Sequence, residues 1–143
     1  MESLLKNCMI DRVKALEAAA QTAITDGDIL DLQGYDSVCA IAILGNVDNG
    51  SVPTLKAYCG DAAALGDGAY KTTTATATAT ATSCDNKLLV LDVVKPGKRY
   101  VRFDMTRASG NAVVDGIVAI RYNARVVPLT QGSDVIDSDI SVG

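Results

Sequence analysis

Apolar and polar residues alternate in three successive stretches between residues 85 and 125, and this region carries the clearest structural signal in the chain. Residues 88–94 are rich in Leu and Val, residues 99–106 alternate, and residues 112–122 follow a Ser-Gly-Asn break. Runs of this length, rich in β-branched residues and separated by Pro-Gly or Ser-Gly-Asn, are typical of strands joined by turns. The region predicts an antiparallel meander of three strands.

The alternation also assigns two faces, because successive side chains of a strand point to opposite sides. One face is almost purely apolar, and the other mixes aliphatic side chains with charges of both signs. Such a mixture occurs at interfaces, and it also occurs on solvated sheets with weak cross-strand ion pairs. The apolar face contains Leu89, Leu91, Val93, Val101, Phe103, Met105, Val114, Val118 and Ile120, and the mixed face contains Leu88, Val90, Asp92, Val94, Tyr100, Arg102, Asp104, Val113, Asp115, Ile117 and Arg121.

Other strands are expected on both sides of this region. Residues 35–44 are apolar on both faces, which predicts a central strand covered on both sides. Residues 52–59 form a further strand, and residues 60–70 form an exposed loop. Residues 71–83 alternate Thr with Ala, which predicts a surface or edge strand that the working assembly pairs or covers. Residues 135–142 alternate too, and predict a final strand or an extended tail that adds to a neighbouring sheet.

The first residues are less regular. Residues 1–11 are interpreted as an N-terminal arm, and residues 11–21 are compatible with a short helix or a strand. Many short strands with little helix predict an all-β fold. We therefore expect a single-domain antiparallel β-sandwich over residues 12–143, with a jelly roll as one topology that fits.

Charge and composition narrow the function. The chain has 13 Lys and Arg against 17 Asp and Glu, and it contains no histidine. A net charge of −4 argues against nucleic-acid binding, which depends on clustered cations. Without histidine the commonest general base and metal ligand is missing. We expect a protein that is not an enzyme and that holds no metal and no cofactor.

The cysteines and the apolar runs bear on the cellular context. The four cysteines include no C-x-x-C pair, and no signal peptide is recognised, so reduced thiols made in a cytosol are expected. The longest apolar run, residues 38–44, is far too short to cross a bilayer. We therefore expect no membrane partner.

Residues 85–131 (DNKLLVLDVVKPGKRYVRFDMTRASGNAVVDGIVAIRYNARVVPLTQ), with LLKNCMIDRV near the start and LQGYDSV before residue 38, resemble a known family. These are the capsid decoration, or cement, proteins of tailed bacteriophages. The resemblance implies a virion protein, made in the host cytoplasm, that binds the outside of the shell as a homotrimer. Its partners would be the major capsid protein and copies of itself. The Thr-Ala tract and the acidic segment after Gly132 depart from the family pattern.

This resemblance leads us to predict contacts through the mixed face and the N-terminal arm. Two alternatives remain open. A head-completion or tail-associated structural protein would form larger rings or tubes. A glycan- or receptor-binding module would need exposed tyrosines, since the chain has no Trp and a single Phe. The residues predicted to make contacts are Arg99, Arg102, Asp104, Asp115 and Arg121, with Leu4 and Leu5 in the arm.

Overall fold

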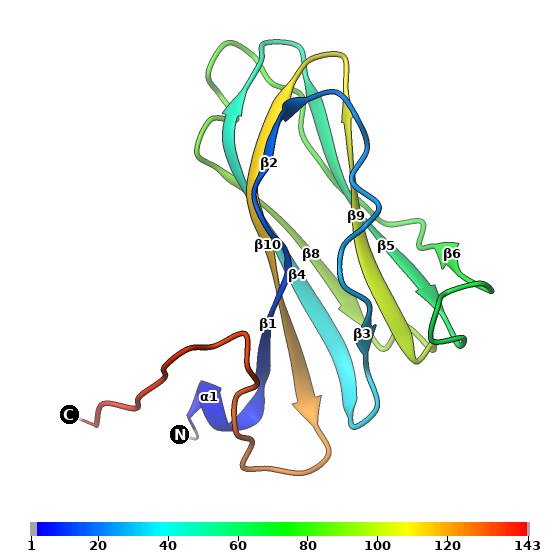
Figure 1. Ribbon diagram of the computed structural model, residues 1–143, viewed down its shortest axis with the longest axis vertical. Coiled ribbons are helices and arrows are strands. Elements are labelled where there is room, and N and C mark those ends of the chain that lie inside the picture. Colours follow the sequence, from blue (N-terminus) through cyan, green and yellow to red (C-terminus); the bar gives the residue numbers. More distant parts are fainter. Residues whose placement is uncertain (1–2, 143) are drawn as a thin grey trace.

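The computed structural model describes residues 3–142. Two antiparallel sheets pack face to face, and the short helix α1 (Leu4–Asn7) lies below them near both ends of the chain (Figure 1). Sheet A has the order β1 (Met9–Lys14), β10 (Ala112–Ala124), β4 (Tyr35–Val47) and β8 (Leu88–Val94), and β2 (Glu17–Ala20) also pairs with β10. The predicted all-β sandwich is confirmed, whereas a jelly-roll topology is not.

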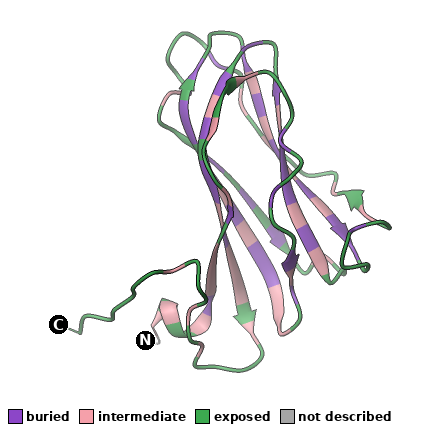
Figure 2. Cartoon of the chain, in the orientation of Figure 1, coloured by how far each residue is buried: buried purple, intermediate pink, exposed green. Residues whose placement is uncertain are grey.

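Sheet B is the second layer. Its order is β3 (Leu30–Asp31), β9 (Tyr100–Ala108), β5 (Val52–Gly60) and β6 (Ala69–Tyr70), and β7 (Ala75–Thr76) also pairs with β5. Every second residue of β5, β8 and β9 is buried between the sheets (Figure 2). The core side chains predicted for β8 and β9 are confirmed, and Phe103 is fully buried at their centre.

The predicted meander is wrong, because β8, β9 and β10 are not neighbours. β8 pairs with β4, β9 pairs with β5, and β10 pairs with β4 and β1, so successive strands alternate between the two sheets. The predicted mixed face is consequently divided between the outer surfaces of two layers. Alternation identifies the buried side of each strand, but the same pattern fits any partner strand.

The assignment of faces in β10 is wrong beyond its middle. The register of β10 against β4 shifts on either side of Val114, and Gly116 has a φ of +155° there. A Cβ at Gly116 would lie 3.2 Å from the carbonyl oxygen of Lys14, so the bulge needs a glycine. Because a bulge inserts one residue, Ile117 faces the core and Val118 faces outward.

Two further expectations are corrected. β4 is central in its sheet, but only one of its faces is covered, since Ile43 is 37% exposed. The Thr-Ala tract buries Ala79 and turns its threonines outward as expected, yet only Ala75 and Thr76 form a strand. Ala77 donates to the carbonyl of Pro53, and proline has no N–H to return the bond, so regular strand pairing is interrupted there, although Ala79 donates to the Ser51 carbonyl beyond it.

The two ends of the chain lie together (Figure 1). β1 begins at Met9, inside the range predicted as an arm, and residues 11–21 are extended rather than helical. Leu129 donates to the carbonyl of Lys6, and Gln131 donates to the carbonyls of Leu5 and Cys8, so this part of the chain is tied to the start. Residues 126–142 contain no strand. The predicted final strand is therefore wrong, and these residues form an extended tail.

Candidate interaction surfaces

The outer side of sheet A is an apolar surface. Paired residues of neighbouring strands lie on the same side of a sheet. Ile41 is paired with Val90 and with Val118, and Ile43 is paired with Leu88, which places these side chains side by side. We call this surface the sheet A face; it comprises Ile10, Cys39, Ile41, Ile43, Leu88, Val90, Val94, Val118 and Ile120.

Several members of the sheet A face are well exposed. Leu88 is 58% exposed, Val90 51% and Val94 61%. Single exposed apolar residues are ordinary on proteins, whereas a contiguous patch marks a site of interaction. The prediction from sequence places Leu88, Val90 and Val94 on the mixed face, but it misses the β4 part of this surface because it treats both sides of residues 35–44 as core. The signal was present, since Ile41, Ile43 and Val90 are all aliphatic.

The two edges of sheet A differ. At the β1 edge, the Ile10 N–H donates to Gln131 Oε1 at 3.0 Å and the Arg12 N–H donates to Asp134 Oδ2 at 2.9 Å. Side chains that follow β10 in the chain therefore accept hydrogen bonds from the outward N–H groups of β1. At the other edge, no strand within residues 3–142 pairs with the free side of β8. An open strand edge of this kind is a template for another strand.

A groove runs beside the open edge of β8. Its volume is about 220 Å³, and it lies between β8 and the start of the Thr-Ala tract. Lys71, Thr72 and Thr73 line it on one side, and residues 91–96 line it on the other. The groove therefore has hydroxyl groups, Asp92 and the cations Lys71 and Lys95 next to the free edge, and Lys71 Nζ donates to the Pro96 carbonyl at 2.7 Å.

The predicted contact residues Arg102 and Asp104 lie on the outer side of sheet B and bind each other. Arg102 Nε donates to Asp104 Oδ1 at 2.6 Å, and its Nη2 donates to Oδ2 at 2.8 Å. The Tyr70 hydroxyl donates to Asp104 Oδ2 at 2.7 Å and covers the carboxylate, which raises the pKa of Tyr70. The Arg102 guanidinium also stacks 5.0 Å from the Tyr58 ring centroid. This cluster fastens β6 to sheet B.

Arg121 joins the two sheets at the end that carries the termini. It binds Asp11 through both carboxylate oxygens at 2.8 and 2.9 Å, and it donates to the Asp31 carbonyl in sheet B at 2.9 Å. Arg99 binds the Asp31 carboxylate at 2.9 and 2.8 Å. Arg121 is thus a clamp between layers rather than a free surface charge.

Arg107 plays a similar part at the opposite end. It is 2% exposed and donates to the carbonyls of Ala18, Thr22 and Ala112. A buried guanidinium needs several acceptors, and these carbonyls provide them. Sequence reasoning misses this residue because the predicted strand ends at residue 106, although Arg107 continues the alternation of Val101, Phe103 and Met105 on the buried side.

The remaining predicted residues are scattered. Asp115 is exposed beside the bulge of β10. Leu4 is 67% exposed on α1, and Leu5 is half-buried beside residues 129–131 and 138–140. The structure brings together Arg102 with Asp104, and it links Arg121 to Arg99 through Asp31. It does not bring the predicted set into one surface, and a contact role for these residues stays a prediction.

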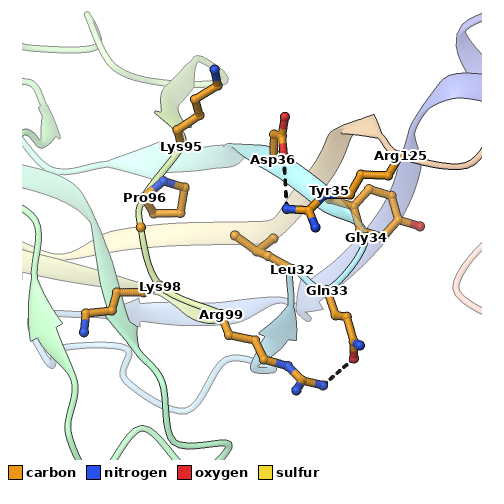
Figure 3. A pocket seen from close by; sticks show the side chains of 11 residues that line it. Leu32, Gln33, Gly34, Tyr35, Asp36, Lys95, Pro96, Lys98, Arg99 and Arg125 are labelled. Atoms are coloured by element: carbon orange, nitrogen blue, oxygen red, sulfur yellow. Dashed lines mark hydrogen bonds and ion pairs between the residues drawn. The ribbon is translucent and has the colours of Figure 1, made fainter.

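An open hollow of about 400 Å³ lies between the Pro96 turn and residues 32–36 (Figure 3). Arg99 crosses it to donate to Gln33 Oε1 at 2.6 Å, and Arg125 lies 3.6 Å from Asp36. Both arginines thus have partners in the chain, and the hollow offers no cluster of uncommitted charge for a ligand. Lys95 also lines the hollow, and its side chain extends away from the other labelled residues (Figure 3).

Comparison with protein-family models and with curated protein sequences finds no match.

Across residues 3–142, no three His, Cys, Asp or Glu side chains are grouped as metal ligands would be. In the same part of the chain, no helix has the length and apolar character needed to cross a bilayer.

Acid is expected to destabilise the fold, whereas pH changes near neutrality are expected to leave its stability unchanged. A hydrogen bond from Arg99 lowers the pKa of Asp31, and one from Lys98 lowers the pKa of Asp61. A carboxyl group with a lowered folded-state pKa stabilises above its unfolded pKa, about 3.9, and loses that contribution as pH falls through the folded value. Thermal unfolding should show a constant Tm between about pH 5 and 8, since there is no histidine to titrate. At pH values below about 4 the Tm should decrease. A decrease in Tm between pH 7 and pH 6 would contradict this prediction.

Proposed function

We propose that this protein is a non-enzymatic virion component that binds the exterior of a phage capsid and stabilises it. The major capsid protein is its partner, and copies of the chain associate with one another, as trimers in the proposed assembly. The resemblance of residues 85–131 to decoration proteins suggests the role. The observation that carries the proposal is the sheet A face, which is apolar, contiguous and on one side of a rigid sandwich.

The chemistry of this surface supports binding to a protein rather than to a small ligand. Ile41, Ile43 and Val90 form a broad aliphatic surface, and the charged side chains beside them are few. Apolar residues surrounded by polar ones characterise the centre of protein interfaces. A protein that reinforces a shell needs such a surface and needs little internal motion. The clamps of Arg107 and Arg121 at the two ends restrict motion between the layers.

Replacement of Ile43 by lysine is expected to abolish binding to empty phage heads or cost at least about tenfold in affinity, because a charge at an apolar interface is left without a partner. Ile43 is at the surface, so the fold should persist. Cosedimentation of the purified chain with heads that lack their decoration measures the effect. The heads come from phages that encode sequences similar to residues 85–131.

Ile29→Lys is the matched control, because Ile29 is 38% exposed and Ile43 is 37% exposed, yet Ile29 precedes β3 in the other layer. The control should bind heads as the unaltered chain does. Equal binding by the Ile43→Lys variant would exclude the sheet A face. Failure of the unaltered chain to bind any such heads would reject the proposed function. A mass far above that of a trimer would favour a head-completion or tail role.

A further inference from the structure

The segment formed by residues 135–142, here called the C-terminal segment, has a strand's alternation but no partner strand. Ile136, Ile140 and Val142 alternate with Asp137 and Asp139. Ile136 is 102% exposed and Val142 is 88% exposed. Within residues 3–142 the segment joins no sheet, and Figure 1 shows it leading away from the sandwich. Ile140 is 40% exposed and lies beside Lys6 and Pro128, whereas the large exposure of Ile136 and Val142 is unfavourable unless another surface covers them.

The open edge of β8 has the complementary features. Leu88, Val90 and Val94 lie on its outer side and are more than half exposed. A strand added to this edge would place Ile136, Ile140 and Val142 beside them on the sheet A face. β8 spans seven residues, so an added segment of eight extended residues, about 26 Å, would cover its full length.

Charge favours the same pairing. The chain after Arg125 contains three aspartates and no Lys or Arg. The β8 edge has Lys87 at one end and Lys95 at the other, both exposed, and Lys71 lines the groove beside it. With the apolar side chains on the outer face, alternation turns Asp137 and Asp139 toward the groove and its lysines. Asp92 is the acidic residue of β8; it lines the groove as well, and its carboxylate accepts a hydrogen bond from the Tyr122 hydroxyl on the outer side.

The segment of one chain cannot reach its own β8 edge. Asp134 accepts the Arg12 N–H and holds the start of the segment at the β1 edge. β10 and β4 lie between β1 and β8, so the two edges are separated by about 14 Å across the sheet. The residues needed to cross this distance would not be available to run along β8. The acceptor must therefore belong to another copy.

We propose that the C-terminal segment of one copy pairs as an additional strand with the β8 edge of a second copy. Donor and acceptor lie on opposite edges of sheet A, so the contact is head-to-tail and can close into a ring. The β1 edge of each copy is already occupied by its own residues 131–134, which leaves β8 as the edge that accepts. This inference extends the self-association within the proposed function, and it does not depend on capsid binding.

The test compares the full chain with two variants by sedimentation mass. One variant lacks residues 135–143 and keeps Asp134 with its bond to Arg12. The other carries Leu88→Lys and Val90→Lys, which place two charges on the acceptor edge. A matched control carries Leu16→Lys and Val126→Lys, since Leu16 is 61% exposed and Val126 is 78% exposed away from β8. The full chain and the control should form the oligomer, and the two variants should be monomers.

Mixing the two monomeric variants is the decisive step. The truncated chain retains an acceptor edge and the edge-blocked chain retains a donor segment, so the mixture should form a 1:1 pair. A full chain that is monomeric, an oligomer that survives either change, or a mixture that fails to pair would each overturn the proposal.

A second measurement does not require the truncated chain to fold. A synthetic peptide of residues 133–143, in excess, should dissociate the oligomer of the full chain, and a scrambled peptide should not. No dissociation by the native peptide would count against the proposal. Capsid binding is measured separately with the Ile43→Lys variant, so failure of strand pairing and failure of shell binding are distinguishable.

Discussion

Replacement of Phe103 by alanine is expected to lower the free energy of unfolding by about 3–5 kcal/mol, one of the largest effects available in this chain. Phe103 is 0% exposed on β9 and is the single Phe in a sequence with no Trp. Its neighbours in the core include many Ala and Val, and small side chains cannot move far enough to fill the space left by a ring. Urea unfolding followed by circular dichroism measures the change.

Leu16→Ala is the control for this experiment. Leu16 is 61% exposed, so its truncation should change the free energy of unfolding by less than about 0.5 kcal/mol. A loss below about 1 kcal/mol for Phe103→Ala would mean that the core repacks freely around the missing ring. The urea m-value should be similar in both variants, because each exposes the same surface on unfolding.

Replacement of Asp104 by alanine is expected to cost about 3 kcal/mol, because removal of one partner leaves a partly buried guanidinium uncompensated. The Asp104 side chain is 2% exposed and the Arg102 side chain is 21% exposed. Removal of Asp104 also frees the Tyr70 hydroxyl, whose pKa is raised by its bond to that carboxylate. Absorbance titration should therefore show one tyrosine ionising at lower pH in the variant.

Asp115→Ala is the matched control, since Asp115 is an exposed aspartate on β10. It should change stability by less than about 0.5 kcal/mol and should leave the tyrosine titration unaltered. A double variant in which Arg102 is replaced by methionine and Asp104 by leucine should be more stable than Asp104→Ala alone, because no charge is left unpaired. If Asp104→Ala proves as mild as Asp115→Ala, the cluster contributes nothing to holding β6.

The buried side of most strands could be predicted from the sequence, whereas the strand neighbours could not. Leu89, Leu91 and Val93 alternate with exposed residues, and that period is set locally by the backbone. Which strand pairs with β8 depends on contacts between residues far apart in the chain. The same limit explains why residues 85–125 were interpreted as a meander, although their strands alternate between layers.

The candidate surface illustrates a second limit. The interval from Val114 to Val118 contains one residue more than regular pairing allows, and a bulge around Gly116 reverses the faces beyond it. Alternation alone cannot locate such an insertion, so Val118 and Ile120 were assigned to the core instead of the sheet A face. Most of the predicted contact residues are charged, and two of them, Arg121 and Arg102, form ion pairs with Asp11 and Asp104. The exposed aliphatic residues of the sheet A face are therefore stronger candidates for contacts with a partner than these charged residues.

The guanidinium of Arg107 donates to backbone carbonyls, whereas that of Arg99 donates to the Asp31 carboxylate. Carbonyl oxygens do not titrate, so the fastening beside Thr22 persists in acid while the one beside Asp31 weakens. The sandwich is thus built with one proton-insensitive end and one that loosens, and the loosening end is where both termini emerge. Acid would therefore remove the Arg99–Asp31 pair at that end, while the bonds from Gln131 to the carbonyls of Leu5 and Cys8 would persist.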